Sequence, residues 1–159
     1  ASKHKVSLIT LHASGGKAMM KAAADAAKEA GPDAPKLIAV TVLTSMNDQD
    51  LIDLGIQRKM REHVLDLGEM AVNSGIDGVV CSPLEASAFR RRLGPKALIV
   101  TPGIRPAGSG LNDQKRSATP RDAVLAGASH IVVGRPILAA PDPSTAARQV
   151  LAEIQSASR

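Results

Sequence analysis

Two glycine-containing segments in the C-terminal half of the sequence have the residue types that bind a phosphate group. The first is Val133-Gly134-Arg135-Pro136, where a β-branched apolar run ends at a residue without a Cβ atom. A ligand could approach the backbone amides at Gly134 closely, and the Arg135 guanidinium could contact two phosphate oxygens at once. A surface turn with a solvated arginine is the alternative interpretation.

The second segment is a loop of 18 residues, from Pro102 to Thr119, that combines glycines with polar and charged residues. Loops longer than about 12 to 15 residues in compact domains are usually lids, binding loops or disordered insertions. Glycine hinges at Gly103, Gly108 and Gly110, together with the polar Gln114, favour a lid that folds over a bound phosphate and expels water. A flexible insertion without function is the alternative.

Three other positions carry reactive side chains, each with a structural alternative. Thr44 follows an apolar run, where a ligand would sit, but Ser45 or Asn47 could instead cap a helix that begins near Asp48. His12 could act as a general acid or base, although no neighbouring carboxylate in the sequence supports that role, which favours a structural hydrogen bond. Cys81 lies in an apolar run without a basic neighbour, which favours a packed, inert thiol.

Other charged residues give no sign of a catalytic or metal site. Arg90-Arg91-Arg92 closes a helical segment that begins near Leu84, and cations there complement the helix dipole, so we expect a solvated face. No cluster of His, Cys and Asp has the spacing of a metal site, and neither a P-loop nor a dinucleotide-binding fingerprint is present.

These candidate residues are positioned by short apolar runs that alternate with helical segments. The runs are rich in β-branched residues, and each is predicted to be a strand buried on both faces: Val6 to Leu11, Leu37 to Val42, Gly78 to Cys81, Ala97 to Val100 and His130 to Val133. Gly15 to Ala30 and Met60 to Asn73 have helical spacing between them, and a final helix is predicted from Ser144 to about Ile154. The alternation predicts an α/β fold of parallel βαβ units.

Two α/β architectures fit this alternation. The strand ends recur about every 31 residues, the unit length of a (β/α)8 TIM barrel, but a doubly wound sheet of five strands also fits the chain length. A doubly wound sheet usually carries its phosphate loop after the first strand, whereas a barrel carries it after the last two strands. Here the anion-binding candidates follow the last two strands, which predicts a TIM barrel of which residues 1–159 supply strands four to eight as a single, partial domain.

Composition narrows the range of functions. The net charge is +5, the hydrophobic fraction is 44%, Cys81 is the only cysteine and Phe89 is the only aromatic residue. Without aromatic stacking platforms the basic balance does not indicate nucleic acid, and a small anionic ligand explains it more simply. No apolar run approaches the roughly 20 residues that span a membrane, and no signal peptide is seen, so a cytoplasmic protein without membrane contact is expected.

Taken together, six motifs occur in the same order as in a known enzyme family. They are Leu11-His12-Ala13-Ser14-Gly15-Gly16, Ala39-Val40-Thr41-Val42-Leu43-Thr44-Ser45, Asp77-Gly78-Val79-Val80-Cys81-Ser82, Val100-Thr101-Pro102-Gly103-Ile104-Arg105-Pro106, Asp113-Gln114-Lys115-Arg116 and Val133-Gly134-Arg135-Pro136. From about Val6 to its C-terminus the chain closely resembles the bacterial orotidine 5'-monophosphate decarboxylases.

The resemblance implies a lyase of pyrimidine biosynthesis that converts orotidine 5'-monophosphate to uridine 5'-monophosphate and carbon dioxide. The family needs no metal and no organic cofactor, and its members are usually homodimeric barrels with active sites near the dimer interface. By resemblance, Thr44 would contact the pyrimidine or ribose. Arg105, Gln114, Gly134 and Arg135 would bind substrate, the last three at the phosphate.

The sequence departs from the family at its catalytic signature. The family motif Asp-x-Lys-x-x-Asp, at the end of the third strand, occurs nowhere in this chain. We therefore nominate no catalytic residue. Three hypotheses remain open: a decarboxylase whose N-terminal third lies outside this sequence, a truncated and inactive fragment that binds nucleotide phosphate, and a related phosphate-binding barrel lyase.

Overall fold

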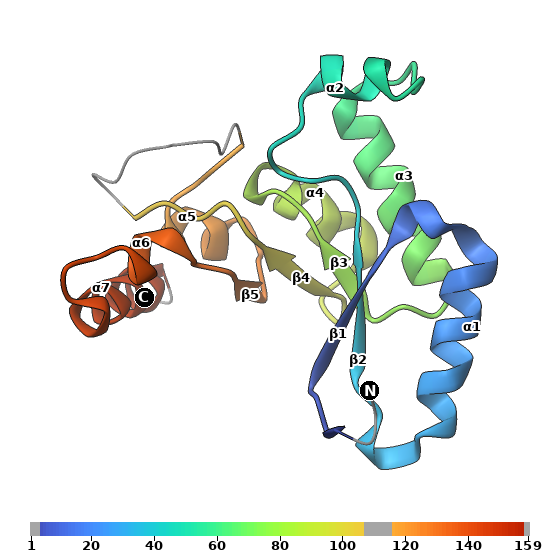
Figure 1. Cartoon of the computed structure of the whole chain (residues 1–159), viewed down its shortest axis with the longest axis horizontal. Helices are drawn as coiled ribbons and strands as arrows, with labels where there is room; N and C mark the ends of the chain where they lie inside the picture. The colour runs from blue at the N-terminus through green and yellow to red at the C-terminus, as the bar shows by residue number, and fades with distance from the viewer. Residues whose placement is uncertain (1–3, 107–115, 158–159) are drawn as a thin grey trace.

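A computed structural model describes residues 4–106 and 116–157, which form parallel strands alternating with helices (Figure 1). The strands are β1 (Leu8–His12), β2 (Lys36–Val40), β3 (Gly78–Val80), β4 (Leu98–Thr101) and β5 (His130–Ile131). The α-helices are α1 (Gly16–Glu29), α2 (Asp48–Asp53), α3 (Met60–Asn73), α4 (Pro83–Leu93), α5 (Pro120–Leu125), α6 (Arg135–Leu138) and α7 (Pro143–Ala157). Two short 3-10 helices, η2 (Ala13–Gly15) and η3 (Gly31–Asp33), flank α1.

The order of the strands decides between the two architectures. Neighbours in the sheet are neighbours along the chain, in the order β1-β2-β3-β4-β5, and every pair is parallel. A doubly wound sheet reverses its strand order at a switch point, whereas the strands of a barrel are added in sequence. The observed sheet is therefore built like a barrel wall, and the doubly wound alternative is excluded.

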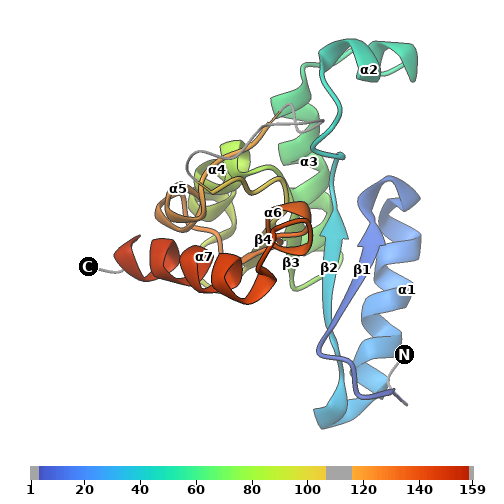
Figure 2. The same ribbon diagram turned by 60° about the vertical axis from the view of Figure 1, so that its left-hand side comes forward.

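The helices also follow the pattern of a barrel. Contacts join α1 to α3, α3 to α4, α4 to α5 and α5 to α7, so the helices form a row in chain order. In both views α1 lies at the β1 end of the molecule, and α5, α6 and α7 gather at the β5 end (Figures 1 and 2). A continuous outer row of helices is the arrangement expected when every crossover has the same hand.

Strand register arranges the side chains in rows across the sheet. One row packs against the helices, and its members are Leu11, Ala39, Val79 and Ile99. The next row lies on the opposite face, where Val40 and Val80 are half-buried and His12 is exposed. The side chains of alternate residues therefore divide between the helix layer and the concave side of the wall.

Two apolar clusters join the helices to the sheet. One gathers around the fully buried Phe89 of α4, with Val64 of α3 and Ile99 of β4, and the other joins Met20 of α1 to Leu37 and Ala39 of β2. The Phe89 ring lies so close to Gly68 of α3 that a Cβ at this position would clash with it. The helix-to-sheet spacing therefore depends on a residue without a side chain.

The predicted strands and helices are largely present, with one correction at the sheet's ends. The prediction that every strand is buried on both faces is wrong for β1 and β5, where Leu8 is 41% exposed and His130 is exposed. These strands form the two edges of the described sheet, so no neighbour covers them. Within the described residues, no helix is both long and apolar enough to cross a membrane.

A second correction concerns Arg90, which the sequence placed on a solvated face. Its guanidinium is partly buried at the end of α4 and donates hydrogen bonds of 2.8–3.2 Å to the carbonyl oxygens of Gly94, Pro95, Ala97 and Gly127 and to the Ser129 hydroxyl. The Ser129 hydroxyl in turn accepts from the Ile99 amide at 3.1 Å. Arg90 thus connects the approaches to β4 and β5, while Arg91 remains exposed.

We predict that Arg90→Met lowers the free energy of unfolding by about 2–4 kcal/mol, because it leaves several half-buried carbonyls without a donor. Urea denaturation measures the change. Arg91→Met is the matched control and should change the free energy by less than about 0.5 kcal/mol. Equal effects of the two substitutions would contradict the role assigned to Arg90.

Candidate functional site

The carboxyl ends of β2, β3 and β4 surround a hollow of about 270 Å³ on the edge of the sheet where barrel enzymes bind their ligands. Its lining is mostly apolar with two hydroxyl groups: Val40, Val42, Leu43, Thr44, Ser45, Val80 and Pro102. The hollow therefore brings together the loop after β2, which carries Thr44, and the start of the loop after β4.

Thr44 lies in this hollow with a largely buried side chain. The alternative role considered for its neighbourhood, capping the next helix, belongs to Asn47. The Asn47 side chain accepts hydrogen bonds from the amides of Gln49 and Asp50, and the Asp50 carboxylate accepts from the Asn47 amide in return. Since Asn47 caps α2, Thr44 and Ser45 are not needed for that purpose.

Arg105 is also buried, with 7% of its surface exposed. Its backbone amide donates to the Ala118 carbonyl at 2.9 Å. This hydrogen bond joins the two described ends of the loop between β4 and α5. Its guanidinium donates to the Ile104 carbonyl at 2.7 Å, while the Nε atom is buried without a hydrogen-bond partner. A buried N–H group without an acceptor reduces the stability of the fold. An anionic ligand would supply the missing acceptor.

Gly134 and Arg135 lie at the same edge of the sheet but are not among the residues that line the hollow. Beyond β5 the chain stays beside β4, because the Val132 amide donates to the Thr101 carbonyl at 2.9 Å. A Cβ at Gly134 would meet no atom within 4 Å, and Arg135 at the start of α6 is exposed. The backbone here is open to a ligand. Gln114 lies outside the described residues.

An ion pair that the sequence did not predict lies beside the hollow. Arg116 Nη1 lies 2.5 Å from Glu85 Oε1, and both side chains are largely buried. Burial raises the pKa of the Glu85 carboxyl above its ordinary value, and the neighbouring Arg116 only partly opposes this. Glu85 follows Ser82, the N-cap of α4, so the sequence pattern indicates a helix start but gives no hint of the partner 31 residues away.

The other two reactive side chains have different outcomes. Cys81 is buried, so the packed thiol is confirmed, and burial together with the nearby Glu85 carboxylate raises the pKa of the thiol far above the usual range. Its lack of reactivity stays a prediction. His12 is exposed at the end of β1, and its side chain does not cap the following 3-10 helix. The expected structural hydrogen bond is therefore not made at that helix.

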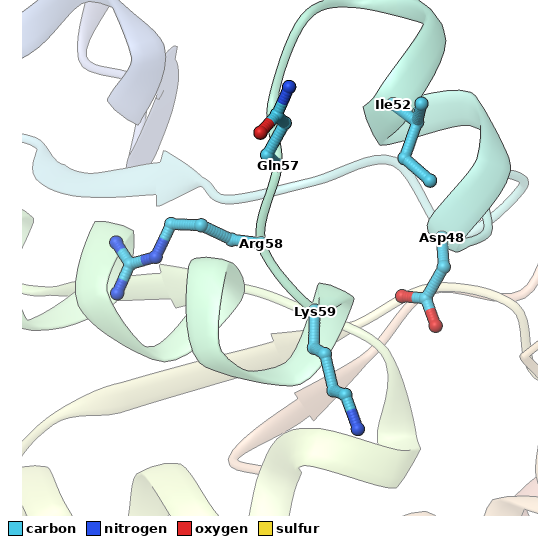
Figure 3. Close-up of a pocket in the computed structure, with 5 residues that line it drawn as sticks. All are labelled: Asp48, Ile52, Gln57, Arg58 and Lys59. Atoms are coloured by element: carbon cyan, nitrogen blue, oxygen red, sulfur yellow. The ribbon is translucent and has the colours of Figure 1, made fainter.

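A larger hollow, of about 500 Å³, lies on the outside of the molecule around α2 (Figure 3). Arg58, Lys59 and Asp48 line it, but the Arg58 and Lys59 side chains extend in different directions (Figure 3). Arg58 forms an ion pair with Asp66, and the Asp48 carboxylate accepts a hydrogen bond from the Met60 amide at 2.8 Å. Arg58 and Asp48 therefore serve local structure, and the Arg58 and Lys59 side chains do not converge on one point (Figure 3).

Metal binding finds no support in residues 4–106 and 116–157, where no three His, Cys, Asp or Glu side chains come close enough to hold an ion. The candidate residues at the carboxyl edge offer hydroxyl, guanidinium and backbone groups. Such groups bind oxygen-rich anions.

The buried thiol gives one prediction. Cys81 should not react with a thiol-specific reagent such as dithiobis-nitrobenzoate at neutral pH in the folded chain, because its thiolate is disfavoured and inaccessible. Full reaction is expected once the chain is unfolded in urea. Rapid labelling before unfolding would contradict the burial.

The buried carboxyl gives a second prediction, with a defined sign. Because the pKa of Glu85 is raised on folding, its contribution to stability is full below the ordinary value of 4.5 and is lost as the pH rises through the folded pKa. Relative to wild type, Glu85→Gln should therefore become progressively more stable as the pH rises from about 4 to 7, measured by urea denaturation. Glu69→Gln, at an exposed ion pair, is the control. A difference that shrinks with pH would contradict the shift.

Known proteins resemble this chain over nearly all of its length. A family model described as "Orotidine 5'-phosphate decarboxylase / HUMPS family" matches residues 1–150. The chain is 50% identical over 153 residues to the orotidine 5'-phosphate decarboxylase of Gluconobacter oxydans, and 50% identical over 155 residues to that of Moorella thermoacetica. These alignments cover 94% of the chain but only 65% and 62% of the two relatives, so the chain spans less than two thirds of their length.

Solved structures confirm the predicted TIM-barrel fold. The crystal structure of orotidine 5'-phosphate decarboxylase from Lactobacillus acidophilus superposes with a TM-score of 0.81 at 42% identity, covering 96% of this chain and 65% of that one. The enzyme from Pyrococcus horikoshii, at 24% identity and a TM-score of 0.62, shares the fold; the alignment covers 94% of this chain and 61% of that one. The ordered sheet, the matched family and these relatives agree, and the chain belongs to the orotidine 5'-phosphate decarboxylase / HUMPS family.

Proposed function

We propose that this chain carries the nucleotide-phosphate-binding part of an orotidine 5'-phosphate decarboxylase, a lyase that forms uridine 5'-monophosphate and carbon dioxide. The observation that carries the proposal is that Thr44, Arg105 and Arg135 lie at one edge of the sheet. The chain is also 50% identical in sequence to two orotidine 5'-phosphate decarboxylases. Thr44 contacts the pyrimidine or ribose in this proposal, and Arg105 binds the substrate.

The phosphate is held at the end of β5. Arg135 supplies a guanidinium with two donors for the phosphate oxygens, and Gly134 leaves the backbone open to close approach. By resemblance to the family, Gln114 is assigned to the same phosphate. The net charge of +5 favours encounter with a nucleotide anion. Because the phosphate does not react, its binding energy can drive loop closure and support the chemical step.

The chemical half of the site is assigned to no residue of this chain. The lysine ion pairs among the described residues join Lys21 and Lys28 to Asp25 on α1, and Lys36 to Asp77 where β2 and β3 begin. None of these described pairs stands at the carboxyl edge, and the Asp-x-Lys-x-x-Asp motif is absent from the sequence. We further propose that the enzyme uses no cofactor, forms a homodimer and is cytoplasmic.

The proposal predicts that Arg135→Ala weakens binding of uridine 5'-monophosphate by more than about 2 kcal/mol, the scale for losing a charge-assisted bidentate contact. Isothermal titration calorimetry on the purified chain measures the change. Arg91→Ala is the control. Arg91 is exposed in the last turn of α4, and its substitution removes the same charge but should leave the affinity nearly unchanged.

Two results would count against the proposal. Unchanged affinity in Arg135→Ala would remove Arg135 from the phosphate site. Failure of the wild-type chain to bind uridine 5'-monophosphate more tightly than uridine would remove the phosphate site itself. Release of carbon dioxide from orotidine 5'-monophosphate by the same preparation would decide whether binding is accompanied by turnover.

A further inference from the structure

The ion pair between Arg116 and Glu85 differs from the other described ion pairs in its burial. Its two side chains are 11% and 7% exposed, whereas those of Arg92 and Glu69, joined at 2.8 Å on the surface, are 47% and 41% exposed. Removing two charges from water is costly, so a buried pair is weak evidence for a stabilising role. The cost is not fully offset here, because Glu85 Oε2 and Arg116 Nε are buried without hydrogen-bond partners.

The geometry of Arg116 indicates a different role. While Nη1 contacts Glu85, Nη2 donates to the Leu43 carbonyl at 3.1 Å, and Leu43 directly precedes Thr44. The guanidinium therefore connects the start of α4 to the loop that follows β2. A single planar group with two donors in fixed orientation sets both contacts at once.

The backbone of the same segment reaches two further points. The Arg116 carbonyl accepts a hydrogen bond of 3.2 Å from the hydroxyl of Ser82, which also caps α4 by accepting from the Leu84 amide. Two residues later, the Ala118 carbonyl accepts from the Arg105 amide at 2.9 Å. Residues 116–118 thus contact the backbone beside Thr44 and the backbone of Arg105, with α4 as the common anchor.

We propose that Arg116 is a positioning residue, which fixes the Thr44 loop and the Arg105 loop relative to one another without touching the ligand. The inference rests on the proposed function, since Thr44 and Arg105 are its assigned ligand contacts. Glu85 holds the guanidinium in the orientation that reaches Leu43. A loop pair held in advance loses less conformational entropy when the nucleotide binds.

The test compares two arginine substitutions that each break one Arg–Glu pair. Arg116→Met should weaken the binding of uridine 5'-monophosphate to the full chain by about fivefold or more, the lower end of typical couplings between sites. Arg92→Met, the matched control at the exposed pair, should stay within about twofold of wild type. Arg116→Lys keeps the charge but not the fork, and should restore part of the affinity.

A second readout separates positioning from a loss of stability. Each variant is studied at a temperature where it is folded, and amide hydrogen exchange is followed at Thr44 and Ser45. Faster exchange at these amides in Arg116→Met but not in Arg92→Met supports the proposal. Unchanged exchange or unchanged affinity in Arg116→Met overturns it, because the loops would then keep their positions, or the ligand would not depend on them.

Two contingencies keep the test decisive. Should Arg116→Met fail to fold, Glu85→Leu takes its place, since it removes the acceptor that orients the guanidinium and should show the same two effects. Should the wild-type chain not bind the nucleotide, the proposed function fails, and the exchange at Thr44 alone decides whether Arg116 positions the loop.

Discussion

Backbone pairing between parallel strands taken in chain order is the constraint on which the rest of this structure depends. Each strand must return to the same end of the sheet before the next can begin, so a helix follows every strand and all carboxyl ends meet at one edge. At Gly78 the ladder is so tight that a Cβ would clash with the Leu98 carbonyl, so β3 and β4 keep their spacing only with glycine there. The loops that carry Thr44, Arg105 and Arg135 lie at the same edge of the sheet for this reason.

The two ends of the sheet use arginine in different ways. At the amino end, Arg90 saturates its guanidinium with carbonyl oxygens and one hydroxyl, which is the arrangement expected of a group that stabilises the fold. At the carboxyl end, Arg105 and Arg116 each keep a buried Nε without a partner. A buried guanidinium that lacks a hydrogen-bond acceptor is unfavourable for folding. Both of these guanidinium groups lie at the edge where the ligand is proposed to bind.

The candidate site is built for binding and orientation. Its hollow combines apolar strand residues with hydroxyls, and residues 116–118 contact both the loop that carries Thr44 and the loop that carries Arg105. Precise placement of such groups matters more than their number, because displacements of about an ångström strongly reduce catalytic power. In the proposed enzyme, this chain would bind the nucleotide, and the catalytic groups would come from the family's Asp-x-Lys-x-x-Asp signature, which this sequence lacks.

The amino-acid sequence alone determined the alternation of strands and helices, the helix from Met60 to Asn73 and the family, because these depend on local periodicity and on the order of motifs. It also placed Thr44, Arg105 and Arg135 after the correct strands. The tertiary structure decided the sheet order, the exposure of β1 and the roles of Arg90, Glu85 and Arg116. Arg90 and Arg116 bind groups as far as 39 and 73 residues away in the chain, and no local pattern encodes such partners, because they meet only when the strands between them pair.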